Sequence, residues 1–340
     1  MTELPTGPVV AWLAQQGILL EQPVKVELIA GGRSNLTYSL SGADERRVVL
    51  RRPPFDGVLE TAHDMSREWR FISALHPTPV PVPAPLAVAS SDGPLGVAFY
   101  VMSFVEGSIL HDAKAAEALA PAVQAAAAAS LVDTMAMLHS CDIDTVGLGD
   151  VAKRVDYVGR QLRRWKRQFD QSTSTEIGAV HAGYEKLSRA VPAQARSSIV
   201  HGDFRLGNMI CGPDGAIRAV LDWELATLGD PLADLGWLLS SWVDAGQWAA
   251  MGLGAPADVP PSVLPGFPER QWMAERYQER TGADLSAIDY YTAFAYWRGA
   301  CISAGVLARY ESGVMGEDGY DPSPLRRTIE ARAEAALELL

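Results

Sequence analysis

The residues best suited to chemistry lie between positions 199 and 224 of this chain. Asp203, Asn208 and Asp222 each lie beside an apolar run of the kind that forms a buried strand. A carboxylate can accept a proton from a hydroxyl group, and carboxylate and amide oxygens are ligands for Mg²⁺. These residue types therefore suit a proton acceptor and metal ligands, and we interpret Asp203 as the acceptor and Asn208 and Asp222 as the ligands.

A β-hairpin is predicted between the two metal ligands. Residues 209–211 and 217–221 have the apolar character of strands, and Gly-Pro-Asp-Gly at 212–215 has the chemistry of a turn. A hairpin of this length brings the residues before and after it to the same end. We therefore expect Asn208 and Asp222 to lie close together.

Phosphoryl transfer is a reaction that needs this combination, because a base takes the proton of the attacking hydroxyl while metal ligands hold Mg²⁺ against the nucleotide phosphates. Arg205 follows Asp203 by two residues and supplies a cation that can offset charge on the transferred group. Asp and Asn are also common turn residues, so each of them alone has a structural alternative. The combination with the hairpin favours the catalytic interpretation.

A glycine-rich segment near the N-terminus is a second candidate site. It follows a predicted strand at 24–29 and contains Gly31, Gly32, Ser34 and Asn35. Glycine permits close backbone approach, and exposed amides with short polar side chains can cover nucleotide phosphates. A plain hairpin turn is the alternative for this segment.

The composition is that of a globular protein with about two lobes. The chain has 340 residues, is 48% hydrophobic and can bury a large core. Its formal net charge of −12 argues against a nucleic-acid partner bound through a general basic surface. We see no secretory signal and no apolar stretch long enough to span a bilayer, so we expect a cytoplasmic protein without a membrane partner. The 3 cysteines are scattered, with no zinc or disulfide pattern.

Strands are expected in the first third of the chain and helices in the rest. Besides 24–29, strands are predicted after residue 35 and at 47–51, 86–89 and 97–102. Hydrophobic periodicity predicts a short helix that begins at residue 9 and ends near Gly17, and further helices at 62–75, 121–139, 153–169, after 229, and near 269–281, 286–310 and 322–339. The Pro-rich segment 76–85 is expected to be an extended spacer, and 252–268 a loop.

Two further groups of charged residues have open interpretations. Asp230 and Asp234 could cap the helix after 229 or brace the catalytic segment by bonding backbone amides, and we treat them as structural. The predicted helix at 153–169 carries Lys153, Arg154, Arg160, Arg163, Arg164, Lys166 and Arg167. It is either a solvated face or a receptor for an anionic group such as the phosphates of coenzyme A.

Five segments, in this order, resemble the aminoglycoside phosphotransferase and choline kinase superfamily. They are Gly-Gly-Arg-Ser-Asn-Leu-Thr-Tyr, Ser-Arg-Glu-Trp-Arg, Phe-Tyr-Val-Met-Ser-Phe-Val-Glu-Gly, His-Gly-Asp-Phe-Arg-Leu-Gly-Asn and Val-Leu-Asp-Trp-Glu. The resemblance covers residues 24–310 and is greatest for the kinase-like domains associated with acyl-CoA dehydrogenases. It implies an α+β, bilobal protein-kinase-like fold. A small antiparallel β-sheet lobe is expected at 1–104, and a larger, mainly helical lobe at 105–340.

The resemblance also implies a site for ATP with Mg²⁺. Arg51 takes the place of the phosphate-gripping Lys on the third strand, and Arg52 is its competitor because strand alternation lets only one face the nucleotide. Glu68 on the following helix is expected to pair with Arg51. The backbone at Ser103 and Val105 is expected to hydrogen-bond the adenine.

The implied reaction moves the γ-phosphoryl group to a hydroxyl of a small molecule, and the dehydrogenase-associated relatives suggest a hydroxylated acyl-CoA. Gly202 in place of Arg, and Asp-Trp-Glu in place of Asp-Phe-Gly, argue against a protein substrate. An aminoglycoside-type antibiotic kinase is one alternative and predicts an acidic acceptor site. A nucleotide-binding regulatory module without turnover is the other, and the intact set of Asp203, Asn208 and Asp222 argues against it. The oligomeric state stays open.

Overall fold

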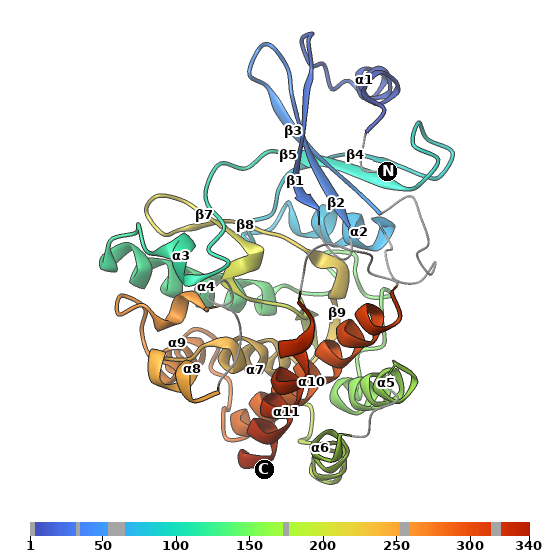
Figure 1. The fold of residues 1–340 in the computed structure, drawn as a ribbon. Coiled ribbons are helices and arrows are strands. Elements are labelled where there is room, and N and C mark those ends of the chain that lie inside the picture. The colour runs from blue at the N-terminus through green and yellow to red at the C-terminus, as the bar shows by residue number, and fades with distance from the viewer. Residues whose placement is uncertain (1–3, 32–34, 54–64, 173–176, 252–258, 314–320) are drawn as a thin grey trace. The chain divides into compact units, whose positions relative to one another are not determined.

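The chain forms two compact units, and each is described by itself. The computed structural model describes residues 4–31, 35–53, 65–172, 177–251, 259–313 and 321–340 (Figure 1). Unit 1 comprises Met1–Glu106, Val146–Leu148 and Arg218–Ala226. Unit 2 comprises Gly107–Thr145, Gly149–Ile217 and Thr227–Leu340. Unit 1 thus takes in two segments from beyond residue 104, the lobe boundary expected from the sequence.

Unit 1 is built on a five-stranded antiparallel sheet with the order β1-β2-β3-β5-β4 (Figure 1). Its main elements are α1 (Thr6–Gln15), β1 (Lys25–Gly31), β2 (Leu36–Ser41), β3 (Arg47–Arg52), α2 (Met65–Leu75), β4 (Pro85–Ala89) and β5 (Phe99–Ser103). The short 3₁₀ helix η2 (Trp223–Leu225) joins them from later in the chain. The strands predicted at the N-terminus are therefore present, with ends shifted by a few residues.

Strand alternation in β3 sorts its side chains between two layers. Val48 and Leu50 belong to the same apolar cluster as Val9 of α1. Successive residues of a strand point to opposite faces, so Arg51 lies on the side of α2 and Arg52 on the side of α1. The geometry of the strand alone thus separates the two candidate arginines.

Unit 2 is mainly helical. Its helices are α3 (Ala113–Ala116), α4 (Pro121–Ser140), α5 (Tyr157–Ser172), α6 (Gly178–Arg189), α7 (Leu232–Ser241), α8 (Ala245–Met251), α9 (Arg270–Thr281), α10 (Ile288–Glu311) and α11 (Ser323–Glu338). Helix α10 contacts α5, α6, α7 and α11, and Figure 1 shows α10 and α11 side by side. The α10 helix is therefore the centre of this unit.

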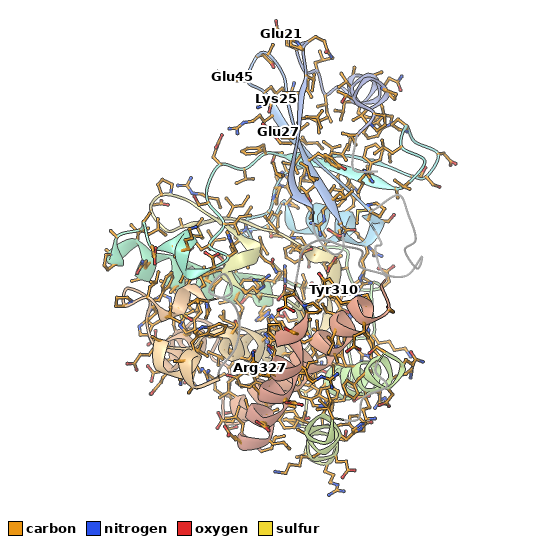
Figure 2. The ribbon with its side chains drawn as sticks, in the orientation of Figure 1. Glu21, Lys25, Glu27, Glu45, Tyr310 and Arg327 are labelled. Carbon is orange, nitrogen blue, oxygen red and sulfur yellow. The ribbon has the colours of Figure 1, made fainter. Side chains whose placement is uncertain are left out.

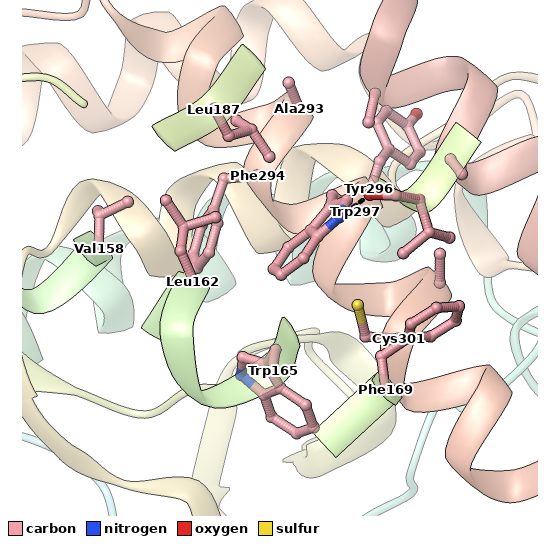
Figure 3. Packing of buried hydrophobic residues seen from close by; sticks show 14 of the residues in the cluster. Val158, Leu162, Trp165, Phe169, Leu187, Ala293, Phe294, Tyr296, Trp297 and Cys301 are labelled. Carbon is pink, nitrogen blue, oxygen red and sulfur yellow. Dashed lines mark hydrogen bonds between the residues drawn. The ribbon is translucent and has the colours of Figure 1, made fainter. Parts of the chain in front are cut away.

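The core of unit 2 surrounds α10 because this helix is apolar on most of its circumference, as expected for a buried helix. Figure 3 shows Trp297 among Phe294, Leu187 and Cys301. The indole of Trp297 is fully buried and donates a hydrogen bond to the carbonyl of Val180 on α6 at 2.9 Å. The polar residues of α10 are thereby fixed in place by a rigid core.

Short strands carry the predicted catalytic segment. In unit 2, β6 (Ser198–Val200) pairs antiparallel with β9 (Thr227–Gly229), and residues 201–208 follow β6. The strands β7 (Met209–Cys211) and β8 (Ile217–Val220) form the predicted hairpin, and the Gly212 amide donates to the Ala216 carbonyl at 2.8 Å to close its turn. The catalytic segment thus begins at the end of one strand and leads into another.

Helix α4 differs from the expectation that no apolar stretch is long enough to span a bilayer. By length and composition it meets that test, with a mean hydropathy of 1.2, because its many alanines raise the average. Half of the tested window is buried in the protein, and Leu131, Met135 and Leu138 are fully buried. This burial is typical of a core helix in a globular protein.

Candidate active site

The charged cluster of unit 1 centres on Glu68 of α2, which is 1% exposed. Its two carboxylate oxygens accept hydrogen bonds from the Tyr100 hydroxyl at 2.9 Å and from Asn35 Nδ2 at 3.0 Å. Arg51 Nε lies 3.0 Å from Glu68 Oε2, so the ion pair expected from the sequence is present. Burial raises the pKa of Glu68, and the charge of Arg51 opposes this rise.

Arg51, and not Arg52, belongs to this cluster. The Arg51 guanidinium also bonds the carboxylate of Asp222. Burial alone would lower the pKa of Arg51, but the charges of Glu68 and Asp222 outweigh it and raise the pKa. Arg52 is fully buried on the opposite face, where it donates to the Tyr38 hydroxyl at 2.9 Å.

The same cluster offers oxygen donors for a divalent cation. Glu68, Asp222 and Glu224 each present an oxygen, and these atoms lie within 4.8 Å of one another. Asn35 Oδ1 is a further buried oxygen, and none of the residues that the structure describes donates a hydrogen bond to it. Mg²⁺ prefers carboxylate and amide oxygens, so this donor set fits the metal expected beside Asp222.

The backbone at Asp222 has a strained conformation. Its φ of 65° lies in the left-handed region, which residues other than glycine seldom adopt. Asp is among the residues that tolerate it best, and such outliers cluster at functional sites. The conformation supports the predicted role of Asp222. Asn208 belongs to unit 2, so its role as a second metal ligand stays a prediction.

The remaining predicted nucleotide contacts are only partly described. Gly31 ends β1, whereas Gly32 and Ser34 lie outside the described residues. Ser103 ends β5, and its N–H donates to the carbonyl of Ala84 at 2.9 Å. That N–H is therefore already paired, and the adenine contact expected at Ser103 and Val105 stays a prediction.

The predicted base, Asp203, has donors on both carboxylate oxygens. The indole N–H of Trp237 donates to Oδ1 at 2.7 Å, and Asn208 Nδ2 donates to Oδ2 at 2.7 Å. Arg205 Nε lies 3.3 Å from Oδ2, and 22% of the Asp203 side chain is exposed. These contacts orient the carboxylate and leave part of it accessible to an acceptor hydroxyl. Asp203, Arg205 and Asn208 are thus brought together as predicted.

Asp234 braces the backbone of the catalytic segment. This residue of α7 is 1% exposed and accepts hydrogen bonds from the amides of His201 at 2.7 Å and Gly202 at 2.8 Å. His139 of α4 lies on its far side, with Nε2 at 3.3 Å. Burial would raise the pKa of Asp234, but these hydrogen bonds and the His139 side chain lower it overall. Asp234 is expected from the sequence either to cap its helix or to brace the catalytic segment, and these hydrogen bonds show that it braces the segment.

Two residues of this site escape the sequence-based prediction, Trp237 and Arg298. The Arg298 guanidinium bonds the carbonyl of Gly202, and its carbon atom lies 4.3 Å from the centroid of the Trp237 ring. Arg298 thus touches both the backbone beside Asp203 and the indole that donates to Asp203. Its only sequence signal is a charged residue within an apolar helix.

A cavity of ≈570 Å³ opens beside these residues within unit 2. Arg205 and Trp237 line it, so it adjoins two side chains that contact Asp203. Its apolar and aromatic wall includes Leu110, Trp237, Trp242, Trp248, Tyr296 and Leu325. Sites for small molecules are concave and mostly apolar with a few placed polar groups, and this cavity has that character.

The basic segment at α5 is partly neutralised by its own neighbours. Arg163 pairs with Asp156 at 2.6 Å, and Lys166 pairs with Asp170 at 2.7 Å. Arg154 donates to Asp144 at 2.8 Å. These exposed pairs agree with a solvated face, and the proposed contact with coenzyme A phosphates stays a prediction.

Comparison with known proteins identifies the family of this chain. Residues 25–275 match the phosphotransferase enzyme family. Acyl-CoA dehydrogenase family member 11 of Gallus gallus is 33% identical over 322 residues, which are 93% of this chain and 40% of that protein. The chain spans about a quarter to two fifths of the length of the curated relatives it matches.

Solved structures share the fold. A protein of Ralstonia eutropha JMP134, described as a candidate aminoglycoside phosphotransferase, is 31% identical and has a TM-score of 0.77, with 99% of each chain covered. Choline kinase of Cryptosporidium parvum Iowa II has a TM-score of 0.66 at 13% identity, covering 98% of this chain and 95% of that one. These likenesses confirm the predicted kinase-like α+β fold.

Proposed function

Since the chain belongs to the phosphotransferase enzyme family, we propose that it moves the γ-phosphoryl group of ATP to a hydroxyl of a small molecule, and that this molecule is a hydroxyacyl-CoA. The observation that carries the proposal is the environment of Asp203. Its carboxylate is oriented by Trp237 and Asn208, is partly exposed, and adjoins residues that line the cavity.

In the proposed reaction the acceptor oxygen attacks the γ-phosphorus, and the acceptor hydroxyl proton passes to Asp203. A new P–O bond forms, the bond from the γ-phosphorus to the bridging oxygen breaks, and ADP leaves. The cation of Arg205 offsets charge on the transferred group. Asp222 and Asn208 would hold Mg²⁺, which would supply positive charge beside the nucleotide phosphates. Arg51, oriented by Glu68, is the cation offered to the nucleotide.

The cavity supports an acyl acceptor over an aminoglycoside. Aminoglycosides are polycations and require an acidic site, but Arg205 and Arg332 line this cavity, and Asp321 is the one acidic residue among its described lining. The aromatic wall suits an alkyl chain. The likeness to acyl-CoA dehydrogenase family member 11 points to the same class of compound.

The test is mass spectrometry of acceptor mixtures incubated with the protein, ATP and Mg²⁺. One mixture holds hydroxyacyl-CoA compounds and the other aminoglycosides, with Asp203→Asn as the control. We expect a phosphorylated hydroxyacyl-CoA with the parent protein and none with the variant. A phosphorylated aminoglycoside would identify an aminoglycoside, instead of a hydroxyacyl-CoA, as the acceptor. Equal activity of the parent and the Asp203→Asn variant would refute the base assignment.

A further inference from the structure

Arg332 of α11 lies in the cavity wall and forms no ion pair at contact distance with an acidic side chain among the described residues, although the charge of the Asp203 carboxylate acts on it from farther away. Its Nη1 is 3.4 Å from the Gly299 carbonyl and 3.4 Å from Ser303 Oγ, which are long contacts for a hydrogen bond. Its other N–H groups have no protein acceptor among the residues that the structure describes. Burial lowers the pKa of Arg332, yet arginine stays charged in proteins. A charged group with unused donors beside a cavity is suited to binding a ligand oxygen.

The backbone of α10 makes room for this guanidinium. A Cβ atom at Gly299 would lie 3.0 Å from Arg332 Nη1 and 3.4 Å from Arg332 Cδ. Glycine inside a helix costs about 0.5 to 1 kcal/mol relative to alanine, so its place in the middle of α10 needs a compensating reason. Arg205 has the same arrangement, because a Cβ at Gly207 would lie 3.1 Å from its guanidinium carbon. Both arginines among the described lining of the cavity therefore lie over glycine.

The charges facing the cavity favour an oxygen-bearing acceptor. Asp321, the one acidic residue among the described lining, already accepts hydrogen bonds from the Ser323 amide at 2.9 Å and the Ser323 hydroxyl at 2.8 Å. Arg205 is oriented toward the carboxylate of Asp203. Of the two arginines in the described lining, Arg332 is therefore the one available to bind the acceptor away from its reacting hydroxyl.

We propose that Arg332 is the residue that recognises the acceptor, by donating hydrogen bonds to its acyl oxygen. A free hydroxy acid offers a carboxylate and its coenzyme A thioester offers a carbonyl, and both present this oxygen at the end of an alkyl chain. The proposal rests on the proposed function and deepens it. Arg332 sets which hydroxyl compounds are phosphorylated, whereas Asp203 and Arg205 serve the transfer itself.

The test compares Arg332→Met with Arg327→Met. Arg327 lies on the same helix, is exposed and does not line the cavity, so it is a matched control (Figure 2). Each protein is assayed with one hydroxy acid as the free acid, with its coenzyme A thioester, and with a diol of the same chain length that lacks the acyl group. A hydrogen bond to a charged group contributes about 1.5 to 3 kcal/mol, which is about a 10- to 100-fold change.

We expect Arg332→Met to lower kcat/KM for the acyl acceptors about 10- to 100-fold, mainly through KM, and to lower kcat/KM for the diol far less. Arg327→Met should behave as the parent with all three compounds. The acceptor with the larger loss identifies the carboxylate or the thioester carbonyl as the bound group. Equal losses on the acyl compounds and the diol, or no loss at all, would overturn the proposal.

A second variant distinguishes the loss of acceptor binding from a folding defect. Gly299→Ala places a Cβ against the Arg332 guanidinium while improving helix propensity, so we expect an unchanged or higher Tm together with a raised KM for acyl acceptors. Titration calorimetry with the same compounds separates this proposal from the proposed function, because binding needs no turnover. If no compound is phosphorylated by the parent, weaker acyl binding by Arg332→Met still supports the site, and equal binding refutes it.

Discussion

At the scale of single residues, the carboxylate of Asp203 depends on a neighbour that does no chemistry itself. Trp237 donates its indole N–H to Oδ1 at 2.7 Å, and the ring is in turn covered by the Arg298 guanidinium. A base must hold its oxygen within hydrogen-bond reach of the proton it accepts. Trp237 is therefore a positioning residue for Asp203.

We predict that Trp237→Phe lowers kcat about 10-fold and changes Tm little. The phenyl ring keeps most of the packing against Arg298, but the N–H donor is lost, and a hydrogen bond to a charged group contributes about 1.5 to 3 kcal/mol. Steady-state kinetics and thermal unfolding of the same preparations check this. An unchanged kcat would show that Asn208 and Arg205 suffice to orient the base.

The sequence predicts Asp203, Asn208 and Asp222 because their spacing along the chain reflects a local motif. It does not predict Trp237, which lies 34 residues from Asp203, or Arg298, which lies 96 residues from Gly202. An indole or guanidinium that reaches a distant loop has the same local pattern as one that packs in a core. Contacts of this kind are decided by tertiary packing.

At the scale of elements, α7 holds the catalytic segment through one buried carboxylate. Asp234 accepts hydrogen bonds from the amides of both His201 and Gly202, directly before Asp203. Removing its charge leaves two buried amides and the nearby His139 without an ionised partner. Breaking a buried, hydrogen-bonded charge costs about 3 to 5 kcal/mol.

We therefore predict that Asp234→Asn lowers the free energy of unfolding by about 3 to 5 kcal/mol at pH 7. The pKa of Asp234 is lowered in the folded state, so its carboxylate stabilises the fold fully above its unfolded-state pKa of about 3.9. That stabilisation is lost as the pH falls through the lower, folded-state pKa. Urea unfolding of the parent and the variant should show a constant difference from pH 7 to about 4 and a shrinking one below.

A difference that already shrinks well above pH 4 would contradict the lowered pKa. Asp230→Asn is a useful comparison, because burial raises the pKa of Asp230 and its side chain contacts the Tyr291 hydroxyl at 2.6 Å instead of the catalytic backbone. Its substitution should cost less stability at neutral pH.

Long periodic helices are the elements that the sequence predicts best. The helices α4, α9, α10 and α11 begin and end within a few residues of their predicted positions. The helices α3 and α8 are not predicted, because four and seven residues give too few turns for a clear pattern. Helix α6 is not predicted either, although it is as long as α9. Their formation depends on packing against the rest of unit 2.

At the scale of the whole molecule, unit 1 is assembled from three separate segments. Trp223 is fully buried and stacks on Phe71 of α2 with ring centroids 6.1 Å apart. The Val220 amide donates to the Pro81 carbonyl at 2.9 Å, and Arg51 pairs with Asp222. The first 106 residues therefore lack part of the core and charge balance of their own unit.

We predict that a fragment of residues 1–106 does not unfold cooperatively, because it lacks Trp223 and Asp222. In the full chain, Trp223→Ala should cost about 3 to 5 kcal/mol, the usual effect of removing a buried aromatic side chain. Near-UV circular dichroism and urea titration check both expectations. A fragment with a sharp unfolding transition would show that the later segments are not needed for the fold.

The three-segment construction has a consequence for biosynthesis. All strands of the unit 1 sheet have been synthesised once the ribosome reaches residue 106. The last residues of this unit, Arg218–Ala226, end about 120 positions later. At about 5 to 20 residues per second, the ribosome needs about 6 to 24 s to supply them. During that interval Glu68 and Arg51 lack Asp222, and Phe71 lacks its aromatic partner, so the emerging sheet is a natural client for chaperones that shield apolar surface.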